Sequence, residues 1–124
     1  MKFYRCNHCG NIFDVIQDAK VVPICCGEPM ELLVANTTDA AREKHVPVVE
    51  RDGDKVTVKV GSVPHPMIEE HYIQWIVIAQ GNVTQRAALA PAEVPEATFT
   101  VDDVNAPLRA YEYCNLHGLW TAEA

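Results

Sequence analysis

Four of the five cysteines lie within the first 26 residues, and this cluster constrains the fold of the N-terminal part more than any other feature. Cys6 and Cys9 share one tight turn, in which Gly10 is free to adopt the positive φ that such a turn requires. Cys25 and Cys26 are adjacent, and neighbouring side chains of a regular strand point to opposite faces. The backbone must therefore bend sharply if all four sulfur atoms bind one ion, which predicts a distorted tetrahedral site.

This four-cysteine site is expected to be structural or to relay electrons. Four thiolates fill the coordination sphere of a tetrahedral metal, so no position remains for a substrate. Ligand type alone allows either iron or zinc. A module of about 35 residues with few apolar side chains also needs a metal or disulfides to hold it together. His8, in the same turn, is expected to face solvent rather than to bind the metal.

The rest of the chain has the pattern of an antiparallel β-sandwich. After a short strand over 31–35, strands are predicted over 46–51, 56–60, 72–79, 84–90, 97–101, 108–114 and 119–121. Asp52-Gly53-Asp54 and Gln80-Gly81-Asn82 are predicted turns. A single helical turn over 40–44, capped by Thr38 or Asp39, is expected to end before Pro47. Many short strands without a long helix predict a mainly β protein with an immunoglobulin-like sandwich.

Composition narrows the possible partners. Hydrophobic residues make up 48% of the 124 residues, which is enough for a core, and the net charge of −7 argues against nucleic acid. A local positive potential can nevertheless attract a small anion to an acidic protein. No apolar run reaches the roughly 18 residues of a membrane helix. The N-terminus has no apolar signal core, so we expect a cytoplasmic protein, in whose reducing compartment clustered cysteines are more often ligands than disulfides.

Four histidines and the remaining cysteine form a second candidate metal site. They lie at predicted strand edges or in loops: His45, His65, His71, Cys114 and His117. A thiolate with imidazoles suits iron, copper or zinc, and iron is favoured because zinc rarely takes five protein ligands. Four imidazoles in a plane with one axial thiolate would leave the position opposite the sulfur open for chemistry.

A blue-copper site is the main alternative for this second set. Such sites use two histidines, a cysteine and a weak axial methionine on a β-sandwich. No methionine follows His117 in the same loop, and two histidines would have no role. The alternative is therefore disfavoured.

The motifs taken together resemble those of desulfoferrodoxin, the two-iron form of superoxide reductase. The matching segments are Cys6-x2-Cys9 with Cys25-Cys26, Glu43-Lys44-His45-Val46-Pro47, His65-Pro66-Met67, Glu70-His71-Tyr72-Ile73-Gln74-Trp75 and Cys114-Asn115-Leu116-His117-Gly118. The resemblance extends over nearly the whole chain, and no ligand of the family pattern is missing.

The resemblance implies two domains and two iron ions per chain. A desulforedoxin-like domain over 1–36 would hold a tetrathiolate iron centre through Cys6, Cys9, Cys25 and Cys26. An immunoglobulin-like domain over 37–124 would hold the catalytic iron, with His45, His65, His71 and His117 equatorial and Cys114 axial. The implied reaction is the one-electron reduction of superoxide to hydrogen peroxide by a homodimer, with electrons from rubredoxin or a similar donor.

Two further residues are candidates for a catalytic role. Lys44, beside His45, is expected to supply positive charge that attracts superoxide and stabilises the developing peroxide. Glu43 resembles the family glutamate that occupies the sixth position of the oxidised iron.

Backbone N–H groups near 115–117 are expected to donate hydrogen bonds to the Cys114 sulfur and so reduce its electron donation. The competing interpretation is an electron-transfer iron protein in which the second site is only structural.

Overall fold

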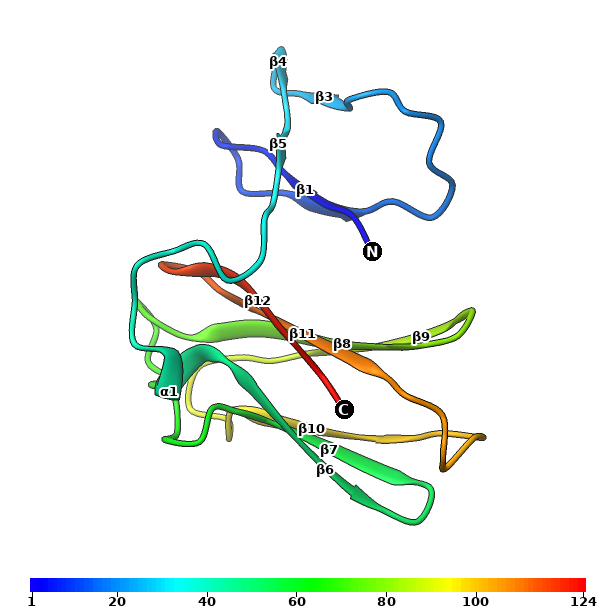
Figure 1. Cartoon of the computed structure of the whole chain (residues 1–124). Helices are drawn as coiled ribbons and strands as arrows, with labels where there is room; N and C mark the ends of the chain where they lie inside the picture. Colours follow the sequence, from blue (N-terminus) through cyan, green and yellow to red (C-terminus); the bar gives the residue numbers. More distant parts are fainter. The chain divides into compact units, whose positions relative to one another are not determined.

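A computed structural model describes every residue from Met1 to Ala124 and divides the chain into two compact units. Unit 1 comprises Met1–Val34 and unit 2 comprises Ala35–Ala124. Both units consist of β-strands, and the one helix is a single turn in unit 2 (Figure 1). No helix in the structure has the length and apolar character needed to cross a membrane.

Unit 1 is a small β module with a very limited core. Its sheet has the order β2-β1-β5, and a separate hairpin pairs β3 with β4. The strands are β1 (Phe3–Arg5), β2 (Ile12–Asp14), β3 (Ile24–Cys25), β4 (Glu28–Pro29) and β5 (Glu31–Leu32). Its buried side chains are few: Phe3, Tyr4, Cys6 and Met30.

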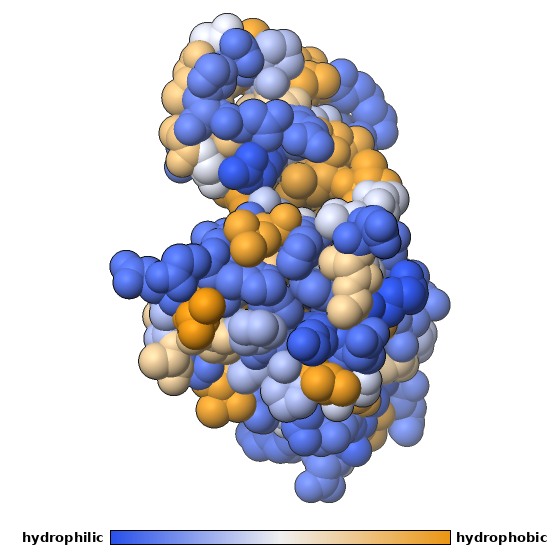
Figure 2. Space-filling view, turned by 90° about the vertical axis from the view of Figure 1, so that its left-hand side faces the viewer, coloured by the Kyte–Doolittle hydropathy of each residue, from blue (hydrophilic) through white to orange (hydrophobic).

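Several apolar side chains of unit 1 remain exposed, including Phe13, Ile16, Val21, Val22 and Ile24. The space-filling view shows hydrophobic residues interrupting its hydrophilic surface (Figure 2). So small a core stabilises the module little, and metal binding therefore has to contribute to its folding.

Unit 2 is a seven-stranded antiparallel sandwich, which confirms the predicted fold class. One sheet has the order β10-β7-β6 and the other the order β12-β11-β8-β9. The strands are β6 (Pro47–Asp52), β7 (Lys55–Val60), β8 (Ile73–Gln80), β9 (Val83–Ala88), β10 (Glu96–Thr100), β11 (Arg109–Cys114) and β12 (Gly118–Glu123). The core between them comes from both sheets, with Val56 and Val58 of β7 packed in one cluster with Ile76 and Ile78 of β8.

The helical turn α1 (Arg42–His45) differs from the prediction in its start and its cap. Its N-cap is Ala41, and no side chain caps it. The helix begins two residues later than predicted, so Thr38 and Asp39 precede the capping position and the predicted cap was wrong. The turn ends where expected, because Pro47 already belongs to β6.

The strand register brings the segments with the candidate ligands to one end of the sandwich. Cys114, the last residue of β11, pairs with Ile73 at the start of β8. Pro47, at the start of β6, pairs with Val60 at the end of β7. The register of β11 against β8 shifts between Tyr113 and Cys114. Such irregularities often occur next to active sites, where they redirect a side chain.

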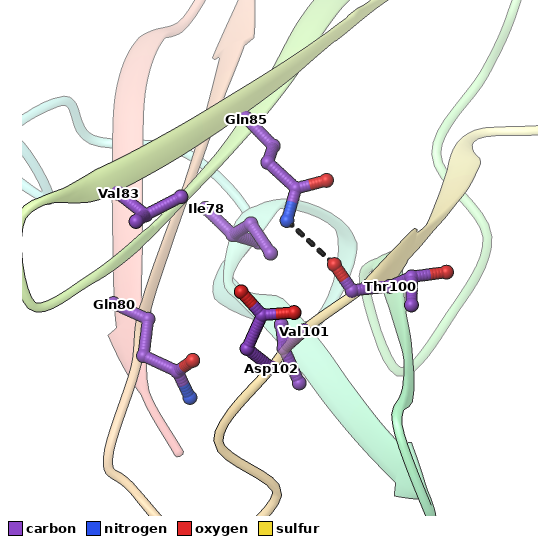
Figure 3. Close-up of a pocket in the computed structure, with 7 residues that line it drawn as sticks. All are labelled: Ile78, Gln80, Val83, Gln85, Thr100, Val101 and Asp102. Carbon is purple, nitrogen blue, oxygen red and sulfur yellow. Dashed lines mark hydrogen bonds between the residues drawn. The ribbon is translucent and has the colours of Figure 1, made fainter.

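A small surface pocket lies at the other end of β8 (Figure 3). It is lined by Ile78, Gln80, Val83, Gln85, Thr100, Val101 and Asp102. The Gln85 amide donates a hydrogen bond to the Thr100 carbonyl oxygen at 2.8 Å. The pocket contains neither histidine nor cysteine, so it is separate from the candidate metal sites.

Candidate metal centres

The four cysteines of unit 1 converge on one point. Their sulfur atoms all lie within 4.8 Å of one another, and Sγ of Cys9 lies 3.7 Å from Sγ of Cys25. Metal–sulfur bonds of about 2.3 Å in a tetrahedron place two sulfurs roughly 3.8 Å apart, so this spacing fits a metal. The sharp bend expected after Cys25 is present: Cys26 has φ 53° and Gly27 has φ 76°.

Backbone hydrogen bonds shape the first cysteine turn. Cys6 donates its N–H to the Asn11 carbonyl at 2.8 Å, and Gly10 donates to the Cys6 carbonyl at 3.0 Å. The Cys9 N–H, 3.5 Å from Sγ of Cys6, is the main reason that the pKa of Cys6 falls to about 6. Hydrogen bonds with the other three cysteines raise the pKa of Cys26 to about 12. A cation removes this competition for protons because it binds all four as thiolates.

His8 lies outside this cluster. Its side chain is half exposed, and its Nε2 lies 3.0 Å from a carboxylate oxygen of Glu28. It faces solvent, as the sequence predicted.

In unit 2, four imidazoles form a closed ring of edge-to-face contacts. His45 contacts His65, with ring centroids 4.8 Å apart, and His65 contacts His71 at 4.6 Å. His71 contacts His117 at 5.1 Å, and His117 contacts His45 at 4.9 Å. Neighbouring planes are nearly perpendicular, at 75° to 88°. The four rings thus surround a common centre.

The nitrogen atoms at this centre are arranged for a cation. Nε2 of His45 lies 3.2 Å from Nε2 of His65 and 3.2 Å from Nδ1 of His117. Metal–nitrogen bonds of about 2.1 Å at right angles would place two nitrogens roughly 3.0 Å apart. Nδ1 of His45 is 2.7 Å from the Ala41 carbonyl oxygen, and Nδ1 of His65 is 2.6 Å from that of Pro66.

Both of these Nδ1 atoms must donate to the carbonyls, so both Nε2 atoms carry lone pairs that face each other. Such a pair cannot hydrogen-bond, and a cation between the nitrogens resolves the repulsion. Nε2 of His71 is buried and has no hydrogen-bond partner, so a third ring also has a nitrogen that a metal would satisfy. The residues present therefore fit a metal.

Burial keeps these imidazoles neutral. It lowers the pKa of His45 and His71, and it lowers the pKa of His65 to about 4. Neutral rings have the lone pairs that metal binding needs.

Cys114 completes the donor set. Its side chain is fully buried, and one ligand atom each of His45, His65, His71 and Cys114 lies within 4.8 Å of the others. His117 joins the group through Nδ1, 3.9 Å from the Cys114 sulfur. Burial raises the pKa of the Cys114 thiol, whereas backbone hydrogen bonds from Leu116 and His117 lower it. Both N–H groups belong to the segment in which donors to the sulfur are expected.

Glu43 and Lys44 are exposed residues of α1, directly before His45. Neither side chain forms an ion pair, so the Glu43 carboxylate is not paired with a nearby lysine. Burial and the neighbouring histidines lower the pKa of His71, and the charge of Lys44 lowers it further. The ammonium group therefore acts electrostatically on the histidine cluster.

Sequence reasoning missed two residues that position the cluster. Trp120 is buried and stacks on His45, with centroids 5.0 Å apart, and its indole N–H donates to the His117 carbonyl at 3.1 Å. Gly61 packs directly against the backbone of α1. A single sequence gives no signal for the stack of Trp120 on His45 or for the approach of Gly61 to α1, because these partners are distant along the chain.

Comparison with known proteins gives matches over both units. The family model described as Desulfoferrodoxin matches residues 37–123, and the one described as Desulfoferrodoxin, N-terminal domain, matches residues 1–33. A desulfoferrodoxin of Syntrophotalea carbinolica is 50% identical over 123 residues, which cover 99% of this chain and 96% of that protein.

Solved structures agree. The superoxide reductase from Treponema pallidum matches with a TM-score of 0.80 and 38% identity, covering 98% of this chain and 97% of that one. A superoxide reductase (1Fe-SOR) from Giardia intestinalis matches with a TM-score of 0.60 and 38% identity, covering 66% of this chain and 97% of that one. Family models, sequence relatives and solved structures all lead to one conclusion: the chain belongs to the desulfoferrodoxin family.

Proposed function

We propose that the chain is a superoxide reductase whose reaction takes place at the histidine–cysteine centre of unit 2. Superoxide, one electron and two protons give one molecule of hydrogen peroxide, and no dioxygen forms. The observation that carries this function is the closed ring of four imidazoles beside a buried thiol. The similar proteins from Treponema pallidum and Giardia intestinalis are both described as superoxide reductases.

The cofactors are two iron ions per chain. In unit 1 the ligands would be Cys6, Cys9, Cys25 and Cys26, and in unit 2 they would be His45, His65, His71, His117 and Cys114. Iron held by these residues would supply the transferred electron and a binding site for the superoxide anion. Four thiolates fill the first site, which therefore suits electron relay rather than catalysis.

The residues around the second site have separate tasks. Lys44 attracts the superoxide anion to an otherwise acidic protein and stabilises negative charge as peroxide develops. The N–H groups of Leu116 and His117 share the charge of the Cys114 sulfur, which favours release of intact peroxide over cleavage of its O–O bond. Glu43 is exposed and forms no ion pair, so its carboxylate would be free to bind the oxidised iron.

The physiological setting is part of the same proposal. We expect rubredoxin or a similar small iron protein as electron donor, a homodimer as the working form, and the cytoplasm as the location. All five cysteines are free of disulfides, which fits a reducing compartment.

Product analysis tests the reaction. Reduced, iron-loaded protein is mixed with a known amount of superoxide, and peroxide and dioxygen are both measured. We expect one peroxide for each superoxide and no dioxygen. Dioxygen and peroxide in equal amounts would mean dismutation, and the proposal would be wrong.

A second experiment separates catalysis from simple electron transfer. Cys9→Ser disrupts the four-cysteine site, and Cys114→Ser removes the thiolate of the other site. In a single turnover with pre-reduced protein, the Cys9→Ser protein should still reduce superoxide and the Cys114→Ser protein should not. The opposite result would assign the reaction to unit 1 and favour the electron-carrier interpretation.

A further inference from the structure

We propose that Asn115 is a positioning residue that holds His71 in the imidazole ring by clamping the backbone on both sides of it. The inference rests on the proposed function only through the metal site of unit 2, and its test uses no superoxide.

Three hydrogen bonds connect Asn115 to the segment that carries His71. The side-chain oxygen of Asn115 accepts the Tyr72 N–H at 2.9 Å, and the side-chain nitrogen donates to the Glu70 carbonyl at 2.9 Å. The backbone N–H of Asn115 donates to the Tyr72 carbonyl at 3.2 Å. These contacts lie immediately before and after His71, and none of them involves His71 itself. The residue that follows the Cys114 thiol thus fixes the position of a histidine more than forty residues away in sequence.

His71 needs this external support more than the buried His45 and His65 do. The rings of His45 and His65 are each oriented by a hydrogen bond from Nδ1 to a backbone carbonyl. The ring of His71 has no side-chain hydrogen bond, and its buried Nε2 has no partner. The hydrogen bonds of His71 itself are those of its backbone with Ile68, at 3.1 Å in each direction. The clamp from Asn115 therefore substitutes for the hydrogen bond that orients a metal-binding imidazole in most sites.

The chemistry of the clamp requires an amide at position 115. A carboxamide is both donor and acceptor, so it satisfies a carbonyl and an N–H two residues apart. Aspartate at this position would keep the acceptor but would place a carboxylate oxygen against the Glu70 carbonyl. Alanine would remove both side-chain bonds and leave the backbone bond to Tyr72. Asn115→Asp and Asn115→Ala are therefore a graded pair of variants.

Cobalt(II) affinity tests the inference without any enzymatic assay. Metal-free full-length protein is titrated with cobalt against a competing chelator, and the thiolate absorption of unit 2 is followed. Cys114→Ser protein supplies the spectrum of the four-cysteine site alone, so the second site is obtained by difference. We expect Asn115→Ala to weaken cobalt binding at unit 2 by about 10- to 100-fold, as loss of a residue that orients a ligand usually does. Asn105→Ala, in the loop before β11, is the matched control and should bind as the wild type does.

A double-mutant comparison shows whether Asn115 acts through His71. In a His71→Ala background, Asn115→Ala should weaken cobalt binding by about twofold or less, because the ring that it positions is gone. In a His65→Ala background the full loss should remain. Equal losses in both backgrounds, or no loss in the single variant, would overturn the inference. Neither result would affect the superoxide assay, so failure of the two proposals can be told apart.

Discussion

Gly61 lies so close to Glu43 that a side chain at this glycine would collide with the helical turn. A Cβ atom at Gly61 would be 2.7 Å from the Glu43 carbonyl oxygen and 3.0 Å from that of Val46. Both obstructing groups belong to the backbone, so neither can rotate away. The absence of a side chain at position 61 therefore lets the end of β7 approach the turn that carries Glu43, Lys44 and His45.

Gly61→Ala should displace this turn and disturb the site. Overpacking of this kind costs about 1–3 kcal/mol, which denaturant unfolding of the metal-free protein would measure. Cobalt affinity at unit 2 should also fall, because His45 moves with the turn. Ser62→Ala is the control: it removes a hydrogen bond to the same Glu43 carbonyl, at 3.2 Å, without adding volume. If Gly61→Ala binds cobalt as tightly as the wild type does, the turn adjusts without displacing His45, and this prediction is wrong.

Trp120→Phe should weaken metal binding at unit 2. Phenylalanine keeps part of the stack on His45 but loses the N–H that donates to the His117 carbonyl. A fully buried carbonyl without its partner costs about 1–3 kcal/mol, and the cost is smaller for the part-buried His117 carbonyl. Trp75→Phe makes the same chemical change where the indole stacks on Tyr113 instead, with centroids 5.8 Å apart. Both variants should unfold more readily, and only Trp120→Phe should lower cobalt affinity. An equal effect on affinity from both would remove the specific role of Trp120.

Lys44→Ala should slow the reaction with superoxide by about tenfold at low ionic strength, because the local positive charge that attracts the anion is lost. The difference should shrink as salt screens the charge. Pulsed superoxide at several salt concentrations measures both effects. Lys55→Ala removes the same charge at the opposite end of β7, where the ammonium donates to Thr100, and should have little effect. If the two variants react equally fast at low salt, Lys44 has no part in the mechanism.

Asp18→Asn should destabilise unit 1 at neutral pH but not in acid. The pKa of the Asp18 carboxyl lies well below its usual range. The main cause is a hydrogen bond from the Lys2 ammonium, and the second is a hydrogen bond from the Lys20 backbone N–H. A carboxyl whose pKa is lower in the folded state stabilises it above the unfolded value of about 4, and this contribution is lost as pH falls further.

Thermal loss of the tetrathiolate absorption would measure this effect. The wild type should survive to a higher temperature than Asp18→Asn at pH 7, and the two should converge in acid. Asp14→Asn removes a carboxylate of the same unit that forms no ion pair, and it serves as the control. A difference between Asp18→Asn and wild type that does not depend on pH would contradict the assignment.

Much of the fold was predictable because local chemistry carries it. Two-residue turns at Gly53-Asp54 and Gly81-Asn82 lie within the predicted turns. The strand predicted over 56–60 coincides with β7, whose Val56, Val58 and Val60 are buried. The cap of α1 was not predictable in the same way. No side chain caps the start of α1. The turn instead packs against Gly61, and the Val63 N–H donates a hydrogen bond to the Glu43 carbonyl at 2.9 Å.

The sequence by itself determined the types of donor: four clustered thiols, and a thiol three residues from a histidine. The donor atom that a residue offers to a metal depends only on its identity, so these features can be recognised in the sequence alone. Tertiary structure alone decided that His45, His65 and His71 meet Cys114, which nitrogen of each ring faces the centre, and that Asn115, Trp120 and Gly61 hold them there. These arrangements depend on strand register and on contacts between residues far apart in the chain. The free energy of such contacts comes from packing in the folded protein and not from the local sequence pattern.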